Sequence, residues 1–554
     1  MIQENFIKIY ENSFRNHWDR PALSNYGEHQ VLAYRDLAQE IARVHVLFNE
    51  CKIRRGDKVA LIGKNTTQWC VVYLATVTYG AIIVPILQDF NPNDVHHIVN
   101  HSQAAFLFVA DSIWENLEEE KIDDVRGVIS LNDMRCLHQK DGETINKILK
   151  STDRLMEEQY PQGFRPEDIK YAELTNDKVV SLNYTSGTTG FSKAVMTTGN
   201  NLAGNITFVT RQNILQADDK LLSFLPLAHA FGCAFEFLYA LSAGCHVTLL
   251  GKTPSPKILL KAFEEVKPNI VITVPLILEK IYKKMILPLL GKRSMRWALN
   301  VPFLDAQIYA QIRKKLVDAF GGRFSQVIIG GAPLNGEVEE FLQKIKFPYT
   351  VGYGMTECAP LISYAHASDY IPSSCGKILD VMEVRIDSED PYTKVGEIQV
   401  KGENVMAGYY KNDEASQAVF TEDGWLKTGD LGTIDKDNYI YIRGRSKSMI
   451  LGASGQNIYP EEIEAKLNNL PFVMESLVLE KGGKLVALVY PDYESVDGTG
   501  INNSNLPLIM EENRKTLNQT VAPYEAISSI QLYPNEFEKT PKKSIKRYLY
   551  TLND

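Results

Sequence analysis

Seven short runs of β-branched and other apolar residues recur along the first two-thirds of the chain, with helix-periodic stretches between them. The runs are KVALIG, AIIVPI, AAFLFVA, GVISL, VVSLNY, NIVITV and QVIIGG, at residues 58–63, 81–86, 104–110, 127–131, 179–184, 269–274 and 326–331. Short, nearly continuous apolar runs are typical of strands buried on both faces of a parallel sheet. Their alternation with helices, such as the periodic stretch 338–345, predicts a layered α/β fold with mostly parallel sheets.

The pattern changes after about residue 445. Pro460-Glu461-Glu462 is typical of the first turn of a helix, because proline fits the first position and acidic side chains complement the helix N-terminus. SLVLE and KLVALVY, joined by Gly482-Gly483, predict a hairpin, and a further helix, a strand and a basic tail follow. A chain of 554 residues is long enough for two to four packed units. We therefore expect a large N-terminal domain over 1–445 and a small, mobile α+β domain over 446–554.

Composition excludes several classes of protein. Lys and Arg number 59 against 68 Asp and Glu, and the resulting net charge of −9 argues against a broad nucleic-acid-binding surface. The seven cysteines show no CxxC or zinc-site spacing, which is typical of reduced thiols in a cytosolic protein. Residues 1–20 are polar and charged, without the apolar run of a signal peptide. A cytoplasmic location is the expectation.

One uncharged stretch, residues 65–88, raises the question of a membrane span. Gly80 divides it into a helix-like run, WCVVYLATVTY, and the strand-like run AIIVPI. Neither part is long enough to cross a bilayer, so we expect a buried helix that leads into a buried strand.

The strongest chemical signal is YTSGTTGFSKAVM at 184–196, directly after an expected strand. Glycines let successive backbone N–H groups converge, hydroxyl side chains add donors, and a lysine adds positive charge, so the segment can cradle a polyphosphate. It is neither a GxxxxGK[ST] loop nor a GxGxxG turn. The alternative is a flexible polar surface loop. The candidate ligands are Thr185, Ser186, Gly187, Thr188, Thr189, Gly190 and Lys193.

This loop resembles the signature of the adenylate-forming (AMP-binding) superfamily, which includes acyl-CoA ligases, luciferases and peptide-synthetase adenylation domains. The family loop ends in P-K-G, whereas this chain has Ser192-Lys193-Ala194, so only the lysine matches. The resemblance implies ATP as a substrate, Lys193 as a catalytic residue, and a large α/β domain followed by a small mobile one.

Further motifs follow in the family's order. Gly330 to Leu334 resembles the segment along the adenine face, so Gly331, Ala332 and Pro333 are implied nucleotide contacts. GYGMTE at 352–357 resembles the adenylate motif. It implies that Tyr353 stacks on adenine beside Gly354 and Met355, that Thr356 binds phosphate, and that Glu357 holds Mg²⁺.

The same resemblance extends across the expected domain junction. In WLKTGD, Asp430 matches the residue that accepts hydrogen bonds from the ribose hydroxyls, and in RGRSK, Arg445 matches a ribose or phosphate contact. Lys447 occupies the hinge position, for which an ordinary charged linker is the alternative. Gly455 lies in a glycine-containing loop that resembles the one facing the pantetheine channel of CoA in acyl-CoA ligases.

The C-terminal motif departs from the family. The family's catalytic lysine is replaced by Ser544, and the neighbouring Lys543 is the candidate to neutralise the reacting carboxylate and phosphate. Lys542 and Lys546 are weaker candidates. The alternative is a solvated basic tail on an enzyme that adenylates slowly.

The acid to be activated is suggested by LPLAHAFG at 225–232 and the apolar CAFEFLYALSAG that follows, which resemble the acyl-pocket segment of long-chain fatty-acid–CoA ligases. His229 would gate the pocket or polarise the carboxylate, or else serve as a core histidine. Phe231 and the aromatic residues after it would line an acyl tunnel or belong to the core. We expect a medium- or long-chain fatty acid, with ATP, Mg²⁺ and CoA.

Three other functions stay open: a ligase for an aryl or other carboxylic acid, an adenylation module that loads a carrier protein, and a nucleotide-binding protein with weakened catalysis. Peripheral membrane contact is compatible with a lipid substrate, but no basic amphipathic anchor is evident in the sequence. The oligomeric state is not indicated.

Overall fold

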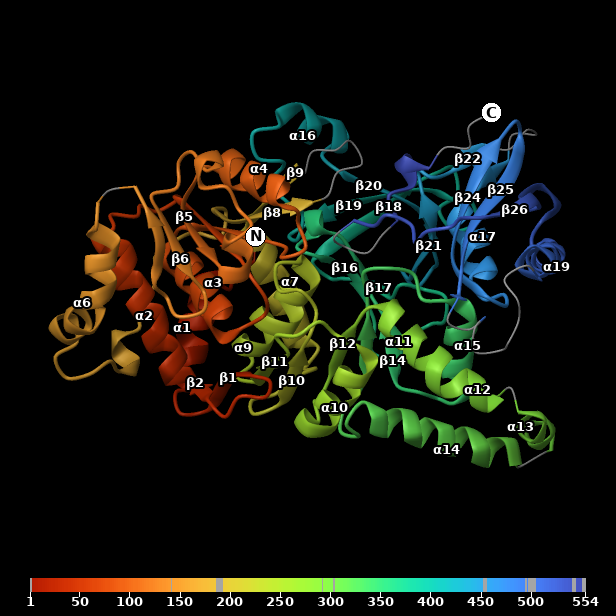
Figure 1. Cartoon of the computed structure of the whole chain (residues 1–554), viewed down its shortest axis with the longest axis horizontal. Coiled ribbons are helices and arrows are strands. Elements are labelled where there is room, and N and C mark those ends of the chain that lie inside the picture. Colours follow the sequence, from red (N-terminus) through yellow and green to blue (C-terminus); the bar gives the residue numbers. More distant parts are fainter. Residues whose placement is uncertain are drawn as a thin grey trace.

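A seven-stranded sheet forms the first layer of the computed structural model, which describes residues 2–140, 142–185, 193–290, 292–301, 304–451, 456–493, 496, 505–540 and 545–550 (Figure 1). The strand order is β7-β6-β5-β3-β4-β8-β9, in which β6, β5, β3, β4 and β8 run parallel and the two edge strands are antiparallel. Five of the expected apolar runs are thereby confirmed as strands. The bounds are β3 (Lys58–Ile62), β4 (Ile82–Ile86), β5 (Ala104–Val109), β6 (Gly127–Ser130), β7 (Cys136–Gln139), β8 (Val179–Thr185) and β9 (Lys193–Thr198).

Helices flank this sheet, and one of them shows how the uncharged stretch of residues 65–88 folds. Helix α3 is buried along nearly its whole length, ends at Gly80 with φ 91°, and leads into β4, as expected. No helix among the described residues has the length and hydropathy needed to span a bilayer. The helices are α1 (Phe6–Asn16), α2 (Tyr34–Glu50), α3 (Thr67–Tyr79), α4 (Pro92–Ser102), α5 (Asp111–Trp114), α6 (Thr144–Gln159) and α7 (Gly199–Arg211).

A second sheet is ordered β10-β11-β1-β2, and a continuous helical segment connects its strands β10 and β11. This segment consists of α8 (Ala230–Gly232), a π-helical stretch (Cys233–Tyr239) and α9 (Ala240–Ser242). π-Helical stretches are frequent at functional sites. The strands are β1 (Pro21–Asn25), β2 (Val31–Ala33), β10 (Lys220–Ser223) and β11 (His246–Leu249).

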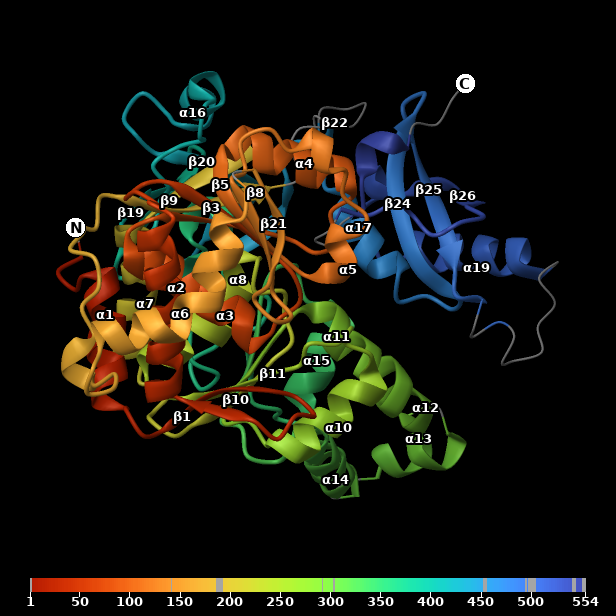
Figure 2. The ribbon, with the colours of Figure 1, turned by 60° about the vertical axis from the view of Figure 1, so that its left-hand side comes forward.

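The remaining two expected strands belong to a parallel three-stranded sheet, β12 (Val271–Thr273), β13 (Val327–Ile329) and β14 (Tyr349–Val351). Helix α15 (Gly336–Lys344) confirms the helical periodicity expected there. Between β12 and β13 the chain makes a helical excursion that forms a lobe of its own in Figures 1 and 2. Its helices are α11 (Pro275–Ile281), α12 (Leu287–Leu290), α13 (Arg293–Leu299) and α14 (Leu304–Ala319), and α10 (Pro256–Val266) precedes β12.

Two antiparallel sheets follow, and nothing in the sequence patterning predicts them. They are ordered β15-β16-β17 and β18-β19-β20-β21. The strands are β15 (Tyr353–Gly354), β16 (Leu361–Tyr364), β17 (Lys377–Ile378), β18 (Met382–Asp387), β19 (Gly396–Gly402), β20 (Leu426–Ile434) and β21 (Ile440–Arg445), with α16 (Asp413–Val419) between β19 and β20.

The C-terminal part is a separate α+β domain with its own apolar core, which includes Ile463, Leu467, Val478 and Met510. The expected helix and hairpin are confirmed as α17 (Pro460–Leu467), β24 (Val473–Lys481) and β25 (Lys484–Pro491). Strand β25 also pairs in parallel with β26 (Ile527–Leu532), and α19 (Leu506–Asn518) packs on β26. The two-stranded β22 (Ile450–Leu451) and β23 (Asn457–Ile458) precede α17.

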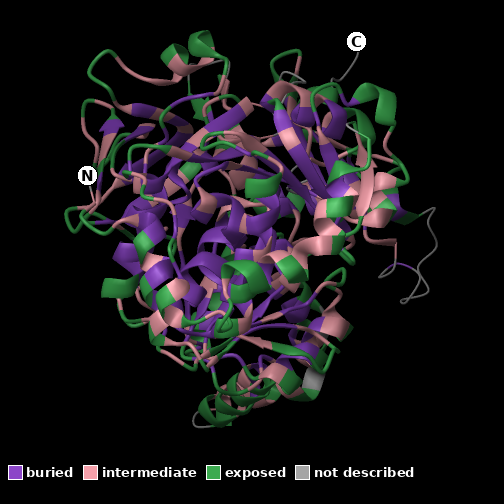
Figure 3. Ribbon diagram, turned by 90° about the vertical axis from the view of Figure 1, so that its left-hand side faces the viewer, coloured by how far each residue is buried: buried purple, intermediate pink, exposed green. Residues whose placement is uncertain are grey.

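The expected fold class is confirmed. Figure 3 shows the buried residues gathered in the strands and central helices of the body. All seven cysteines are free thiols, as expected, and each is buried or half-buried.

Candidate active site

The expected phosphate loop connects two antiparallel strands. Thr185, the last residue of β8, is paired with Lys193, the first residue of β9, and its Oγ1 donates to the Lys193 carbonyl oxygen at 3.4 Å. Ser186, Gly187, Thr188, Thr189 and Gly190 lie outside the described residues. The hairpin therefore sets the position of Lys193, because that residue begins the returning strand.

Tyr409 joins the predicted catalytic lysine to the predicted magnesium ligand. The Lys193 Nζ lies 4.8 Å from the centre of the Tyr409 ring, and the Tyr409 hydroxyl donates to Glu357 Oε1 at 2.9 Å. Burial and the neighbouring Glu357 raise the pKa of Tyr409 well above its ordinary value, so its hydroxyl keeps its proton. None of the sequence motifs includes Tyr409. The local sequence marks this position only by the glycine that precedes it, Gly408.

Backbone pairing holds Tyr409 in place. The Met196 N–H donates to the Gly408 carbonyl at 2.9 Å, and the Tyr410 N–H donates to the Ala194 carbonyl at 2.8 Å. The segment around Tyr409 thus lies along β9, beside the start of the strand where Lys193 stands. On the other side, the Met406 N–H donates to the Glu357 carbonyl at 2.8 Å.

Glu357 sits in a short 3-10 turn, Thr356–Cys358, after β15. Among the described residues, no group of three or more His, Cys, Asp or Glu side chains is arranged to hold a metal ion. Mg²⁺ bound with a nucleotide commonly takes one or two carboxylates, with phosphate oxygens and waters as the other ligands. A half-buried carboxylate with a tyrosine donor on one oxygen fits that mode, and the neighbouring Thr356 hydroxyl adds a polar group.

A second cluster joins Tyr353, Asp430 and Arg445. The Tyr353 hydroxyl donates to Asp430 Oδ2 at 2.6 Å, and Arg445 Nε lies 2.8 Å from Asp430 Oδ1. Asp430 and Arg445 are also register partners of β20 and β21. Burial raises the pKa of Asp430, while Arg445 and the Tyr353 hydroxyl oppose that rise. Asp430 Oδ2 accepts the Tyr353 hydrogen bond, Oδ1 pairs with Arg445, and each oxygen retains a lone pair for a ribose hydroxyl.

The cluster of Lys193, Tyr409 and Glu357 is adjacent to the cluster of Tyr353, Asp430 and Arg445. Tyr353 and Glu357 are four positions apart, and the charge of Glu357 contributes to the raised pKa of Asp430. Glu461, in the first turn of α17, acts on Asp430 in the same way. The C-terminal domain therefore borders this site.

The predicted adenine segment follows β13, at the carboxyl edge of the parallel three-stranded sheet. Gly331 has φ 88°, in the left-handed region, and Ala332 and Pro333 are exposed. Ligands of open α/β sheets commonly bind at such an edge. Gly354 is required for a packing reason, because a Cβ there would lie 2.1 Å from the Pro360 carbonyl oxygen. Met355, the remaining residue of the predicted nucleotide set, is half-buried.

The predicted acyl segment touches the adenine segment. A Cβ on Gly330 would lie 3.0 Å from Cζ of Phe231, so the aromatic ring packs directly on that glycine. His229 begins the helical segment, and its Nδ1 accepts from the Phe231 N–H at 3.3 Å. Phe237 belongs to the core, where its ring packs edge-on against Trp69 and Tyr73.

Glu236, inside this apolar segment, was not singled out by any motif. Its Oε2 accepts from Ser223 Oγ at 2.9 Å and from the N–H groups of Phe224 and Leu225 at 3.2 and 3.1 Å. Burial raises the pKa of Glu236 well above its ordinary value. The side chain thereby fastens the start of the 225–232 segment to the π-helical stretch.

The hinge and tail residues are only partly described. Lys447 is exposed in the turn after β21, while Gly455 and Lys543 fall outside the described residues. Other basic groups of the tail hold carboxylates. Arg547 binds Glu464 through Nη1 at 2.8 and 2.9 Å, Lys546 lies 3.6 Å from Glu538, and Lys539 lies 2.5 Å from Glu475.

Comparison with known proteins agrees with this geometry. The family model described as AMP-binding enzyme matches residues 10–410. The chain is 27% identical over 537 residues to the long-chain-fatty-acid–CoA ligase FadD15 of Mycobacterium tuberculosis, covering 89% of this chain and 86% of that protein. It is 28% identical over 497 residues to a long-chain-fatty-acid–CoA ligase of Escherichia coli O6:H1, covering 85% and 82%.

Solved structures share the fold. ATP-bound MatB from Rhodopseudomonas palustris superposes with a TM-score of 0.74 at 22% identity, covering 97% of this chain and 98% of that one. The anthranilate CoA ligase AuaEII in complex with anthranoyl-AMP superposes with a TM-score of 0.77 at 19% identity, covering 99% and 96%. With the family match spanning most of its length, the chain belongs to the AMP-binding, adenylate-forming enzymes and is similar to their acyl-CoA synthetases.

Proposed function

We propose that the acid activated by this AMP-forming acid–CoA ligase is a medium- or long-chain fatty acid. The observation that carries the proposal is the packing of Phe231 on Gly330, which joins an apolar helical segment directly to the predicted adenine segment. An acyl chain beside that segment would have its carboxylate next to the nucleotide. Relatives named as fatty-acid–CoA ligases support the same substrate class. An aryl acid is the second candidate, since the same fold serves the anthranilate ligase.

The first half-reaction is proposed to be in-line attack of the carboxylate on the α-phosphate of ATP, with release of pyrophosphate. Lys193 would bind phosphate oxygens, and the Tyr409 ring and hydroxyl would hold Lys193 and Glu357 in register. Bound Mg²⁺ would neutralise phosphate charge beside Glu357. Asp430 would bind the ribose, with Tyr353 and Arg445 fixing its carboxylate.

Lys543 is our proposed source of the positive charge that the family takes from the position of Ser544. The support is that Lys539, Lys546 and Arg547 lie close to carboxylates within the C-terminal domain. A lysine committed to a carboxylate is less available to a second anion.

The second half-reaction is proposed to follow rotation of residues 446–554 about Lys447, which would bring the Gly455 loop to the acyl-adenylate. The CoA thiolate would attack the acyl carbonyl, and AMP would leave. We expect Lys447→Pro, which stiffens the hinge, to retain acid-dependent pyrophosphate release and to lose acyl-CoA formation. Equal loss of both half-reactions would contradict a hinge at this residue.

The decisive experiment is pyrophosphate release over a panel of acids, each with and without CoA. Fatty acids of medium or long chain should give the highest kcat/KM, and CoA should raise turnover. Preference for aryl acids would favour the second candidate, and thioester formation only on a carrier protein would identify an adenylation module. ATP binding without acid-dependent release would identify a nucleotide-binding protein with weakened catalysis.

A further inference from the structure

Helix α4 places His101 against the strand that leads into the predicted phosphate loop. The His101 Nδ1 lies 2.7 Å from the hydroxyl oxygen of Tyr184, and the two rings meet edge-on with their centres 5.8 Å apart. Tyr184 lies in β8 directly before Thr185, the first of the predicted phosphate ligands. The histidine therefore contacts the hairpin at the base of the loop.

The same histidine also contacts the segment that carries Tyr409. The ring of Tyr410 packs edge-on against the His101 ring, with the centres 5.9 Å apart. Lys411 Nζ donates to the His101 carbonyl oxygen at 3.1 Å. One residue of α4 is thus joined both to β8 and to residues 410–411, which come from segments more than two hundred positions apart in the chain.

The predicted catalytic lysine stands between these two segments. Ala194, the residue after Lys193 in β9, pairs with Tyr184 on one side. On the other side its carbonyl oxygen accepts from the Tyr410 N–H at 2.8 Å. His101 therefore contacts both neighbours of the strand that begins with Lys193.

The protonation states of both side chains are compatible with a hydrogen bond between them. Burial lowers the pKa of His101, and the neighbouring His97 and Lys411 lower it further, so the ring is neutral at pH 7. Burial raises the pKa of Tyr184, and the neighbouring Tyr410 adds to that rise, so its hydroxyl keeps its proton. The Tyr184 hydroxyl can therefore donate to Nδ1 of a neutral imidazole. Tyr184 is 6% exposed, so little water is available to replace this partner.

From these contacts we propose that His101 is a positioning residue for the phosphate loop, which fixes the start of β9 through Tyr184 and Tyr410. It acts through those two side chains and does not itself touch the nucleotide. The loop sequence contains two glycines, whose conformational freedom raises the cost of ordering a loop around a ligand. Strand ends that are already held in place lower that cost. The inference rests on the proposed role of the loop and of Lys193 in ATP binding.

The test is isothermal titration calorimetry of the full chain with ATP and Mg²⁺, without acid or CoA. His101→Leu should raise the Kd for ATP about fivefold, because the buried Tyr184 hydroxyl loses its partner. His101→Asn should stay within about twofold of wild type, because its side-chain amide lies at the same distance along the side chain as Nδ1 and can make the same bond. The stoichiometry reports the folded fraction, so a merely structural role would lower the stoichiometry and leave the Kd unchanged.

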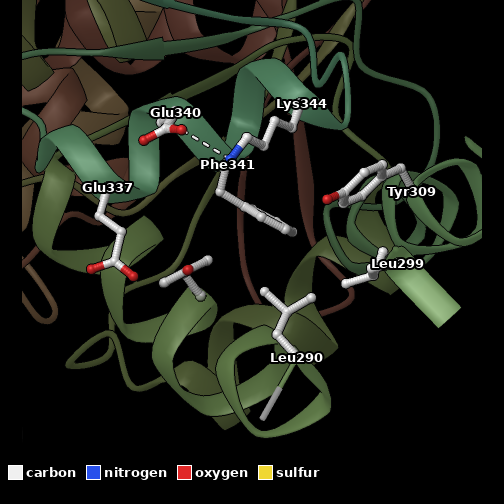
Figure 4. Close-up of a pocket in the computed structure, with 8 residues that line it drawn as sticks. Leu290, Leu299, Tyr309, Glu337, Glu340, Phe341 and Lys344 are labelled. Atoms are coloured by element: carbon white, nitrogen blue, oxygen red, sulfur yellow. Dashed lines mark ion pairs between the residues drawn. The ribbon is translucent and has the colours of Figure 1, made fainter. Parts of the chain in front are cut away.

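A double-mutant cycle tests whether the two side chains act together. Tyr184→Phe should also raise the Kd about fivefold, and the double variant His101→Leu/Tyr184→Phe should bind no more weakly than either single variant. His366→Leu is the matched control for the histidine, because its ring also packs edge-on against a tyrosine, Tyr364, and its Nε2 lies 3.2 Å from the Gln212 carbonyl oxygen. Tyr309→Phe is the control for the lost hydroxyl, since Figure 4 shows Tyr309 at a pocket of about 190 Å³ between α14 and α15. Both controls should keep the wild-type Kd.

An unchanged Kd in His101→Leu, or losses that multiply to about 25-fold in the double variant, would overturn the proposal. Equal losses in His101→Leu and His101→Asn would also overturn it, because the amide keeps the hydrogen bond. Lys193→Ala distinguishes this failure from failure of the proposed function. If Lys193→Ala raises the Kd and His101→Leu does not, the positioning role alone is wrong. If His101→Leu raises the Kd and Lys193→Ala does not, the role given to Lys193 is wrong and the coupling of His101 to the loop stands.

Discussion

Removal of a single hydroxyl, in Tyr409→Phe, should separate the two roles of Tyr409 in the candidate site. The substitution deletes the 2.9 Å hydrogen bond to Glu357 Oε1 and keeps the ring that lies 4.8 Å from Lys193 Nζ. Tyr409 is 5% exposed, so little water is available to replace the lost donor. A hydrogen bond to a charged group contributes about 1.5–3 kcal/mol, and partial hydration of Glu357 favours the lower end, or roughly a tenfold effect.

We therefore expect kcat/KM for ATP to fall roughly tenfold in Tyr409→Phe, with a higher Mg²⁺ concentration needed for half-maximal rate. The KM for the acid should change little, because the hydroxyl faces Glu357 and not the acyl segment. Tyr409→Leu, which also removes the ring, should lose roughly another two- to fivefold. The assay is pyrophosphate release over a series of Mg²⁺ concentrations.

Tyr441→Phe is the matched control, because its hydroxyl donates to Asp435 Oδ2 at 3.1 Å outside both clusters. Its kcat/KM should equal that of wild type. A Tyr409→Phe enzyme with unchanged kcat/KM and unchanged Mg²⁺ dependence would refute the role given to this hydrogen bond, and an equal loss in Tyr441→Phe would show that the effect is not local.

Three further predictions concern the tail and two buried groups. Lys543→Ala should slow pyrophosphate release by ~10²–10³-fold with ATP binding retained, whereas Lys542→Ala should keep most of the rate. If Lys542→Ala is the slower variant, Lys542 neutralises the reacting carboxylate and phosphate instead. Glu236→Ala should destabilise the protein by about 3 kcal/mol in denaturant unfolding, because Ser223 and two N–H groups lose their acceptor. Glu236→Gln keeps the acceptor and should lose less stability than Glu236→Ala, since burial raises the pKa of Glu236 and disfavours its charged form; equal losses in the two variants would contradict this. Burial lowers the pKa of His45 to about 4, below the value of about 6.5 in the unfolded chain. The free energy of unfolding should therefore be highest above pH 6.5 and should fall by roughly 3 kcal/mol as the pH drops from 6.5 to 4. This pH dependence should be absent in His45→Gln.

Local patterning was sufficient for much of the parallel architecture. All seven apolar runs are strands, because burial on both faces demands continuous β-branched residues that are visible within five or six positions. The antiparallel sheet of β18 to β21 was not anticipated, although the motifs that contain Asp430 and Arg445 lie in its strands β20 and β21. Its half-buried strands alternate in burial, for example in β20, and such short alternation is a weaker signal than a continuous run.

The sequence by itself determined the residue types available for the chemistry and their order along the chain: Lys193, Glu357, Asp430 and the basic tail. Only the tertiary structure decided which of these residues lie close together and which side chains connect them. Tyr409 reaches Glu357 across 52 positions, and Tyr353 reaches Asp430 across 77. Periodicity reports the surroundings of a residue within one element, whereas contacts between distant segments depend on strand order and register, which are set by packing of the whole core.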